Sequence, residues 1–219
     1  MLYLYALSEP PTDAPDVLGL DETPLAVERM GDIDAVVGAL DRARVEPSER
    51  AVLDHARVVA AVAEANVAVL PARFGRGFTD GPALRSAVGE RSAELTRALD
   101  LVRGCSELAL RVLAPSDGAS TVAASGRDYM RTRLDEQRRT ERLADELHEP
   151  LAALARAATK SVAAGSELVL SAAYLVPRDT LADFEALVTE LGAGHPDLTI
   201  ACTGPWPPYS FATAEPGAA

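Results

Sequence analysis

The 219-residue sequence is poor in the residues that most often build metal or redox centres. It has two cysteines, Cys105 and Cys202, and three histidines. The cysteines lie far apart without CxxC spacing, and no histidine has another four residues away, so neither a metal site nor a redox pair is predicted. Cys105 has no base near it in sequence that would make it a nucleophile. We therefore expect no catalytic residue, no cofactor and no metal.

Long hydrophobic runs are also missing. No run approaches the ~20 apolar residues that cross a bilayer, and the N-terminus lacks the basic segment of a signal peptide. Lys160 is the only lysine, and the net charge is −12. Such a charge disfavours nucleic acids and anionic membranes, both of which attract basic surfaces. We expect a soluble, cytoplasmic protein that binds neither nucleic acid nor membrane.

One stretch, NVAVLPARFGRGF from Asn66 to Phe78, combines an apolar run with a proline and two glycines. The run predicts a short buried strand that ends at the proline, which cannot donate to a sheet ladder. The loop 75–77 lacks the third glycine of GxGxxG and the lysine of a P-loop, so a phosphate site is disfavoured. We expect Arg73 to be structural, pairing with a carboxylate or carbonyls beside the apolar Phe74.

The N-terminal half alternates strand and helix patterns. Strands are predicted at 1–7, 25–30, 33–40, 67–70 and 107–113, and helices from Pro47 to the fourth strand and from Gly81 to Gly104. The buried stripe of the first helix is predicted to be Val52, His55, Ala56, Val59, Val62 and Ala63. His55 is thus expected to be a core histidine bonded to backbone, whereas His148 and His195 look incidental.

A Ser/Gly/Ala-rich segment near residues 115–126 predicts a linker between two domains, 1–118 and 119–219. A long helical stripe follows from Arg127 to about Val162, with Pro150 as a kink or break. Coiled-coil association through this helix stays open, since its heptads are imperfect. Together the patterns predict an α+β protein, with helices on mixed sheets in a ferredoxin-like arrangement.

A β-α-β unit ends the sequence, with strands at 167–176 and 198–202. One such unit is too little sheet to stand alone, so we expect its strands to pair with 1–7 or another N-terminal strand. The tail CTGPWPPYSF then contains Trp206, Tyr209 and Phe211 among three prolines. Two interpretations remain open: a strap over one end of the core, and an exposed patch for a protein partner.

Five segments in order resemble the gas vesicle protein F/L family (GvpF/GvpL): VLPARFGRGF, the helix with His55, GCSELALRV, SAAYLVPRD and CTGPWPPYSF. Ala72 departs from the bulkier residue usual in the family. The resemblance implies a two-domain α+β protein with a ferredoxin-like element and no catalytic activity. It also implies a place at the gas vesicle, and contacts with the small hydrophobic shell protein and other accessory proteins.

The leading hypothesis is therefore a non-enzymatic accessory or minor structural protein, which binds shell subunits through an apolar surface while its charge keeps the complex soluble. The alternative is a small-ligand-binding regulatory module on a ferredoxin-like sheet. An enzyme that uses the glycine loop with Arg73 or Arg76 is a third hypothesis. The candidate partner-binding or structural residues are Arg73, Phe74, Trp206, Tyr209 and Phe211.

Overall fold

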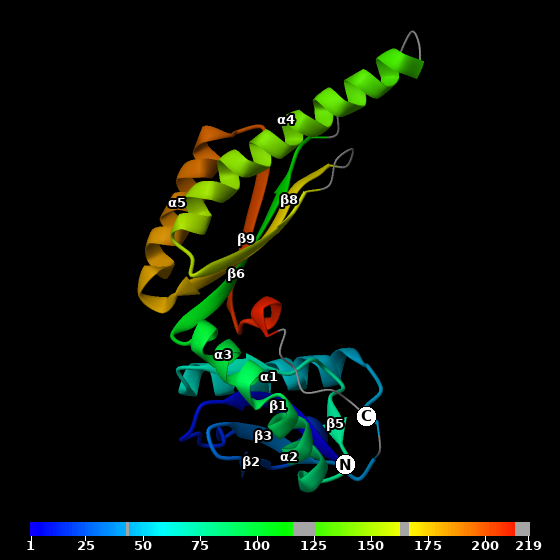
Figure 1. The fold of residues 1–219 in the computed structure, drawn as a ribbon, viewed down its shortest axis with the longest axis vertical. Helices are drawn as coiled ribbons and strands as arrows, with labels where there is room; N and C mark the ends of the chain where they lie inside the picture. Colours follow the sequence, from blue (N-terminus) through cyan, green and yellow to red (C-terminus); the bar gives the residue numbers. More distant parts are fainter. Residues whose placement is uncertain (43, 116–125, 163–166, 213–219) are drawn as a thin grey trace. The chain divides into compact units, whose positions relative to one another are not determined.

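The structure is a computed structural model that describes residues 1–42, 44–115, 126–162 and 167–212. The chain divides into two compact units, Met1–Ser106 with Trp206–Ala219, and Glu107–Pro205. Figure 1 shows an α+β chain in which each unit has its own sheet. Most of the predicted linker lies outside the described residues, and a domain boundary between 118 and 119 stays a prediction. No helix within the described residues is long and apolar enough to span a membrane.

The first unit contains most of the predicted N-terminal elements. They are β1 (Leu2–Ser8), a 3-10 turn (Leu20–Glu22), β2 (Leu25–Arg29), β3 (Asp34–Ala39), α1 (Glu49–Ala65), β4 (Val69–Pro71), β5 (Gly77–Phe78), α2 (Gly81–Glu90) and α3 (Ser92–Val102). The strand order is β2-β3-β1-β4, with β5 paired to β1. The single helix predicted between Gly81 and Gly104 is wrong, because the chain breaks at Arg91 into α2 and α3.

Both sheets are antiparallel, so the predicted mixed sheet is wrong. The β-α-β passes suggested parallel neighbours, but the strands that α1 joins are not neighbours. β1 lies between β3 and β4 and pairs antiparallel with each. A crossover helix therefore indicates a parallel direction without indicating adjacency.

Side-chain caps fix two helix starts in the first unit. The Ser48 hydroxyl accepts a hydrogen bond from the Ala51 amide at the start of α1, and the Asp80 carboxylate accepts one from the Ala83 amide at the start of α2. Each cap satisfies an amide that has no partner within its helix. Because Asp80 occupies the start of α2, an anion would meet a carboxylate there.

The predicted apolar stripe of α1 is partly wrong. His55, Val59 and Val62 are buried, but Val52 and Ala56 are exposed. The buried face is completed by Val58, which was not predicted, so the true stripe is rotated around the helix. It packs in one core with Tyr3, Tyr5 and Val36 from the sheet. Val67, predicted to be buried, is likewise exposed, because β4 begins only at Val69.

The second unit is built on a four-stranded sheet in the order β7-β8-β6-β9. Its elements are β6 (Cys105–Leu113), α4 (Gly126–Ala153), β7 (Ala157–Ser161), β8 (Leu168–Pro177), α5 (Leu181–Gly194) and β9 (Thr199–Trp206). Figure 1 shows α4 and α5 on one face of this sheet. Ala144, Leu147 and Leu151 of α4 enter its core beside Tyr174 and Phe184.

One prediction for the C-terminal half is wrong, and a second is confirmed in one of its two alternatives. The long helix does not reach Val162: it ends at Ala153, with Pro150 inside it, and the chain continues as β7, which pairs with β8. The last strands, β8 and β9, do not pair with residues 1–7, but both lie beside another N-terminal strand, as the second predicted alternative had it. β9 lies beside β6, the strand predicted at 107–113, which belongs to the same sheet.

Candidate functional site

The glycine loop is held by a chain of hydrogen bonds that begins at Tyr3 on β1. The Gly75 amide donates to the Tyr3 hydroxyl at 2.9 Å, and this hydroxyl lies 3.0 Å from Nδ1 of His55. Nε2 of His55 lies 3.0 Å from the Ala72 carbonyl. A carbonyl only accepts, so Nε2 bears the proton and Nδ1 accepts from Tyr3. The predicted core histidine bonded to backbone is confirmed.

Burial keeps the members of this chain neutral. Desolvation lowers the pKa of His55, partly offset by the bond to Ala72. Desolvation also raises the pKa of Tyr3 to about 12. A neutral imidazole is the form that the Tyr3 bond requires, so the electrostatics and the geometry agree. The arrangement fixes the loop to β1 and α1.

Phe74 and Arg73 occupy different environments in this loop. The half-buried ring of Phe74 stands edge-on to His55, with centroids 5.8 Å apart, and to Tyr3 at 6.4 Å. Arg73 is exposed. Gly75 turns the chain with φ +86°, a conformation that favours glycine. Phe74 thus seals the Tyr3–His55 cluster, while Arg73 faces solvent from the same loop.

The aromatic tail splits into a buried and an exposed part. It belongs to the first unit from Trp206 onward. Phe211 is only 7% exposed and lies in a 3-10 turn, Tyr209–Phe211. Trp206 ends β9 and is 53% exposed, and Tyr209 is also exposed. One ring therefore packs as a strap would, and two rings remain at the surface.

An apolar surface on the outer side of α1 was not predicted. Leu53 is 62% exposed, and Val52 and Ala56 beside it are exposed as well. Leu18 adds a further exposed leucine next to α1, since its carbonyl accepts from Arg57. We call these four residues the α1 patch. Two of its members, Val52 and Ala56, had been predicted to lie on the buried stripe of this helix.

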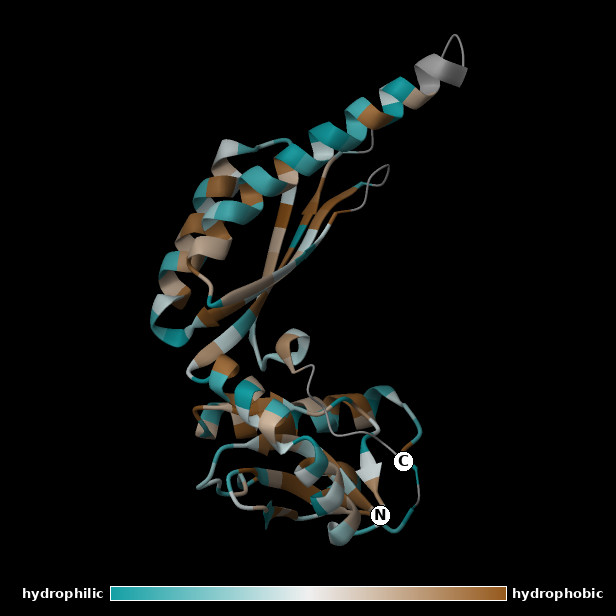
Figure 2. Ribbon diagram, in the orientation of Figure 1, coloured by the Kyte–Doolittle hydropathy of each residue, from teal (hydrophilic) through white to brown (hydrophobic). Residues whose placement is uncertain are grey.

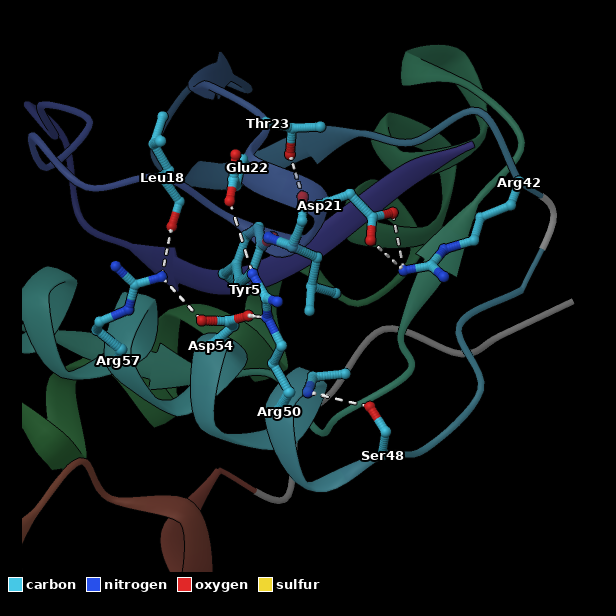
Figure 3. Close-up of polar contacts among 12 residues, drawn as sticks. Tyr5, Leu18, Asp21, Glu22, Thr23, Arg42, Ser48, Arg50, Asp54 and Arg57 are labelled. Carbon is cyan, nitrogen blue, oxygen red and sulfur yellow. Dashed lines mark hydrogen bonds and ion pairs between the residues drawn. The ribbon is translucent and has the colours of Figure 1, made fainter.

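A polar pocket of about 360 Å³ opens between the 3-10 turn and the start of α1. Figure 3 shows ion pairs along it: Arg42 lies 2.9 Å from Asp21, and Arg50 lies 3.6 Å from Glu22. A hydrogen bond to the core holds the 3-10 turn in place, because the Leu20 amide donates to the buried Tyr5 hydroxyl at 2.7 Å. Gly19 permits this approach, since a Cβ there would collide with the Tyr5 oxygen.

The backbone is unusual at the same pocket. Asp21 and Glu22 are consecutive non-glycine residues in the left-handed region, with φ of 54° and 57°. Such conformations cost about 1 kcal/mol or more per residue and persist where surrounding contacts hold them. Here the ion pairs of both carboxylates and the bond of Thr23 to the Leu20 carbonyl hold the turn.

The second unit contains a similar tyrosine–histidine pair, and His148 is not incidental. Its Nδ1 lies 2.9 Å from the Tyr174 hydroxyl, and the two rings are 5.4 Å apart. Burial lowers the pKa of His148. The sequence signal was present, since His148 continues the buried stripe of Ala144, Leu147 and Leu151. In the part of the chain that the structure describes, no three metal-ligating side chains come together.

Known proteins resemble this chain in sequence over both of its units. A family model for the gas vesicle synthesis protein GvpL/GvpF covers residues 1–213. Gas vesicle protein F2 of Halobacterium salinarum is 32% identical over 188 residues, which span 85% of this chain and 79% of that protein. Gas vesicle protein L of a Streptomyces species is 32% identical over 250 aligned positions, which span 96% of this chain and 92% of its own.

The fold also matches solved structures. The crystal structure of GvpF from Anabaena sp. superimposes with a TM-score of 0.81 at 19% identity, covering 97% of this chain and 95% of the other. GvpF from Microcystis aeruginosa gives a TM-score of 0.80 at 20% identity, with 97% and 98% covered. Sequence and fold thus agree along nearly the whole length, and the chain belongs to the GvpL/GvpF family of gas vesicle synthesis proteins, with a role in gas vesicle formation.

Proposed function

We propose that this chain is a non-enzymatic accessory or minor structural protein that binds the small hydrophobic shell protein of gas vesicles, together with other vesicle proteins, during assembly. Its place is then the gas vesicle in the cytoplasm. Family membership supports the role in vesicle formation. The observation that supports a binding role is the α1 patch, an apolar surface on an otherwise charged protein.

The α1 patch suits a hydrophobic subunit for a physical reason. Ala56 lies four residues after Val52 and three after Leu53, so it neighbours both on the helix surface. Leu18 widens that surface, and Arg50 and Arg57 bring charge to its edge. A soluble protein rarely leaves contiguous apolar side chains in water unless a partner covers them. The exposed rings of Trp206 and Tyr209 are proposed as a second contact for vesicle proteins.

The remaining site residues are proposed as structural. Arg73 and Phe74 shape the glycine loop, and Phe211 is the strap that packs the tail on the core. We further propose a two-domain protein whose second sheet is ferredoxin-like. The element order β6-α4-β7-β8-α5-β9 and the strand order β7-β8-β6-β9 support that arrangement.

A pull-down with purified shell protein tests the binding role. Leu53→Glu with Val52→Glu should reduce capture by tenfold or more, on the order of a hot-spot loss, while leaving the melting temperature unchanged. Leu101→Glu is the matched control, because Leu101 is an exposed leucine on another helix of the same unit. Equal capture by all variants would rule out the α1 patch as the binding surface.

The polar pocket favours a second candidate function, a small-ligand-binding regulatory module. The guanidinium groups of Arg42 and Arg50 line it together with carboxylates, so a zwitterionic small molecule could pair with both charges. A thermal-shift screen with nucleotides and amino acids separates the two functions. A large shift that Arg42→Gln abolishes would favour the ligand-binding module over the assembly role.

A further inference from the structure

The first half of α4 projects beyond the sheet that its second half covers. Figure 1 shows the helix running past the ends of the strands of its own unit. Every side chain from Met130 to Arg139 is exposed, and the contribution of α4 to the hydrophobic core begins only at Leu143. We call residues 130–142 the arm. Its exposed residues include Met130 at 60% and Leu134 at 50%, one turn apart on the same side.

The arm is basic in an acidic protein. It contains five arginines and three carboxylates, whereas the whole chain has a net charge of −12. The arginines are Arg131, Arg133, Arg138, Arg139 and Arg142. Figure 2 shows the arm as mostly hydrophilic, with hydrophobic bands between.

The rest of the helical layer has the opposite charge. Residues 143–153 of α4 and the whole of α5 contain no lysine or arginine. They carry six exposed carboxylates, which we call the acidic layer: Asp145, Glu146, Glu149, Asp183, Glu185 and Glu190. α4 and α5 contact each other, so these groups belong to one surface.

The charge order along α4 is the reverse of the order that stabilises an isolated helix. Carboxylates are favoured near an N-terminus and cations near a C-terminus, yet Glu149 stands in the last turns and arginines fill the first half. Short helices without tertiary packing are marginal in water. The arm therefore gains little stability from the helix dipole or from tertiary packing. A surface that covers it would supply this missing stabilisation.

We propose that the arm binds the acidic layer of a second copy of this chain. The arginines would meet the carboxylates of the other copy, and the exposed Met130 and Leu134 would be removed from water at the same contact. A twofold axis makes the contact reciprocal, since each copy supplies one arm and one acidic layer. The equal net charges repel at long range, but salt at physiological strength screens that repulsion beyond about 8 Å.

This inference goes beyond the proposed function. Neither the α1 patch nor the aromatic tail takes part in it, so loss of shell-protein capture and loss of self-association are separate results. Arms and acidic layers lie in the second unit, and the variants that test shell binding lie in the first.

Analytical ultracentrifugation of the full chain tests the proposal. We expect a monomer–dimer equilibrium that Arg138→Glu with Arg142→Glu weakens by about 100-fold. Arg44→Glu with Arg97→Glu is the matched control, since it changes the net charge equally at exposed positions of the first unit. Its equilibrium should stay within about threefold of the unmodified chain.

A charge exchange completes the test. Glu149→Arg with Glu185→Arg should also abolish self-association, and mixing this variant with the Arg138→Glu, Arg142→Glu variant should restore a heterodimer. A chain that stays monomeric to about 0.1 mM would overturn the proposal. So would a dimer that ignores the arm variant, or two variants that fail to associate when mixed.

Discussion

The Tyr3 hydroxyl donates to Nδ1 of His55 across 3.0 Å and thereby joins β1 to α1. The same hydroxyl accepts from the Gly75 amide, 72 positions along the chain. One oxygen thus links three segments, and a ring stack of Tyr5 on His55, with centroids 5.6 Å apart, fixes the imidazole plane. The glycine loop is a structural part of the core for this reason.

Tyr3→Phe should destabilise the chain although it removes a single atom. Both the Gly75 amide and Nδ1 of His55 lose their partner, and a buried polar group without a partner costs about 1–3 kcal/mol. Urea unfolding followed by circular dichroism measures the loss. Thr96→Val is the control, because it removes a hydroxyl from an exposed position of α3 and should be nearly neutral. Equal stability of Tyr3→Phe and the unmodified chain would contradict the hydrogen-bond chain.

Stability should fall as the pH drops below about 6.5. Burial lowers the pKa of His55 and His148 in the folded chain below the ordinary 6.5, so the unfolded chain takes up protons first. The stability that comes from burying these two histidines in their neutral form is fully present above the unfolded pKa. It is lost as the pH falls toward the folded pKa. Urea unfolding between about pH 5.5 and pH 8 measures it. His55→Gln with His148→Gln should make the free energy of unfolding less dependent on pH in this range. An unchanged pH dependence would show that other groups cause it.

Leu70→Asp should cost several kcal/mol, in the upper range for point mutants, because it places a carboxylate in the core. Leu70 is only 4% exposed and pairs with Leu7 of β1. Val67→Asp, three residues earlier, is the control and should be nearly neutral, since Val67 is exposed. Thermal unfolding of the two variants compares them, and similar losses would show that β4 is wrongly placed.

Phe211→Ala and Trp206→Ala should separate the two roles of the tail. Phe211 is buried, so its truncation should cost about 3–5 kcal/mol of unfolding free energy. Trp206 is half exposed, so its truncation should cost much less and instead weaken capture of vesicle proteins. Differential scanning calorimetry measures the loss of stability, and the shell-protein pull-down measures the loss of capture. The opposite pattern would exchange the roles assigned to these rings.

Local chemistry made the helix starts and the core histidine predictable. Proline and serine before Glu49 mark α1, and the Ser48 hydroxyl caps it as such residues do. His55 stands among valines at helical spacing, which predicted burial and required a partner for its ring. The partner itself could not be predicted, because Tyr3 is 52 positions away and only the sheet order brings it near.

The elements that were wrongly predicted from the sequence are those whose structure depends on contacts between distant segments. Residues 157–161 read as the end of a helix, since alanine favours helices, yet they form β7 because β8 offers a ladder for them. Val52 and Ala56 fit an apolar stripe and remain exposed, since a stripe indicates a face without saying what covers it. The pocket at Asp21 could not be predicted for a similar reason. The residues that line it come from segments about 20 to 30 positions apart, which only the tertiary fold brings together.

The first unit is interrupted in sequence, and this has a consequence for its synthesis. It is assembled from Met1–Ser106 and from Trp206 onward, and the intervening segment builds the second unit. At about 5–20 residues per second, a ribosome needs roughly 5–20 s for that segment. During this time the nascent first unit lacks Phe211, whose ring is buried in the finished protein. Its folding is therefore completed only after the second unit has been made, which reverses the usual order in which an N-terminal domain matures first.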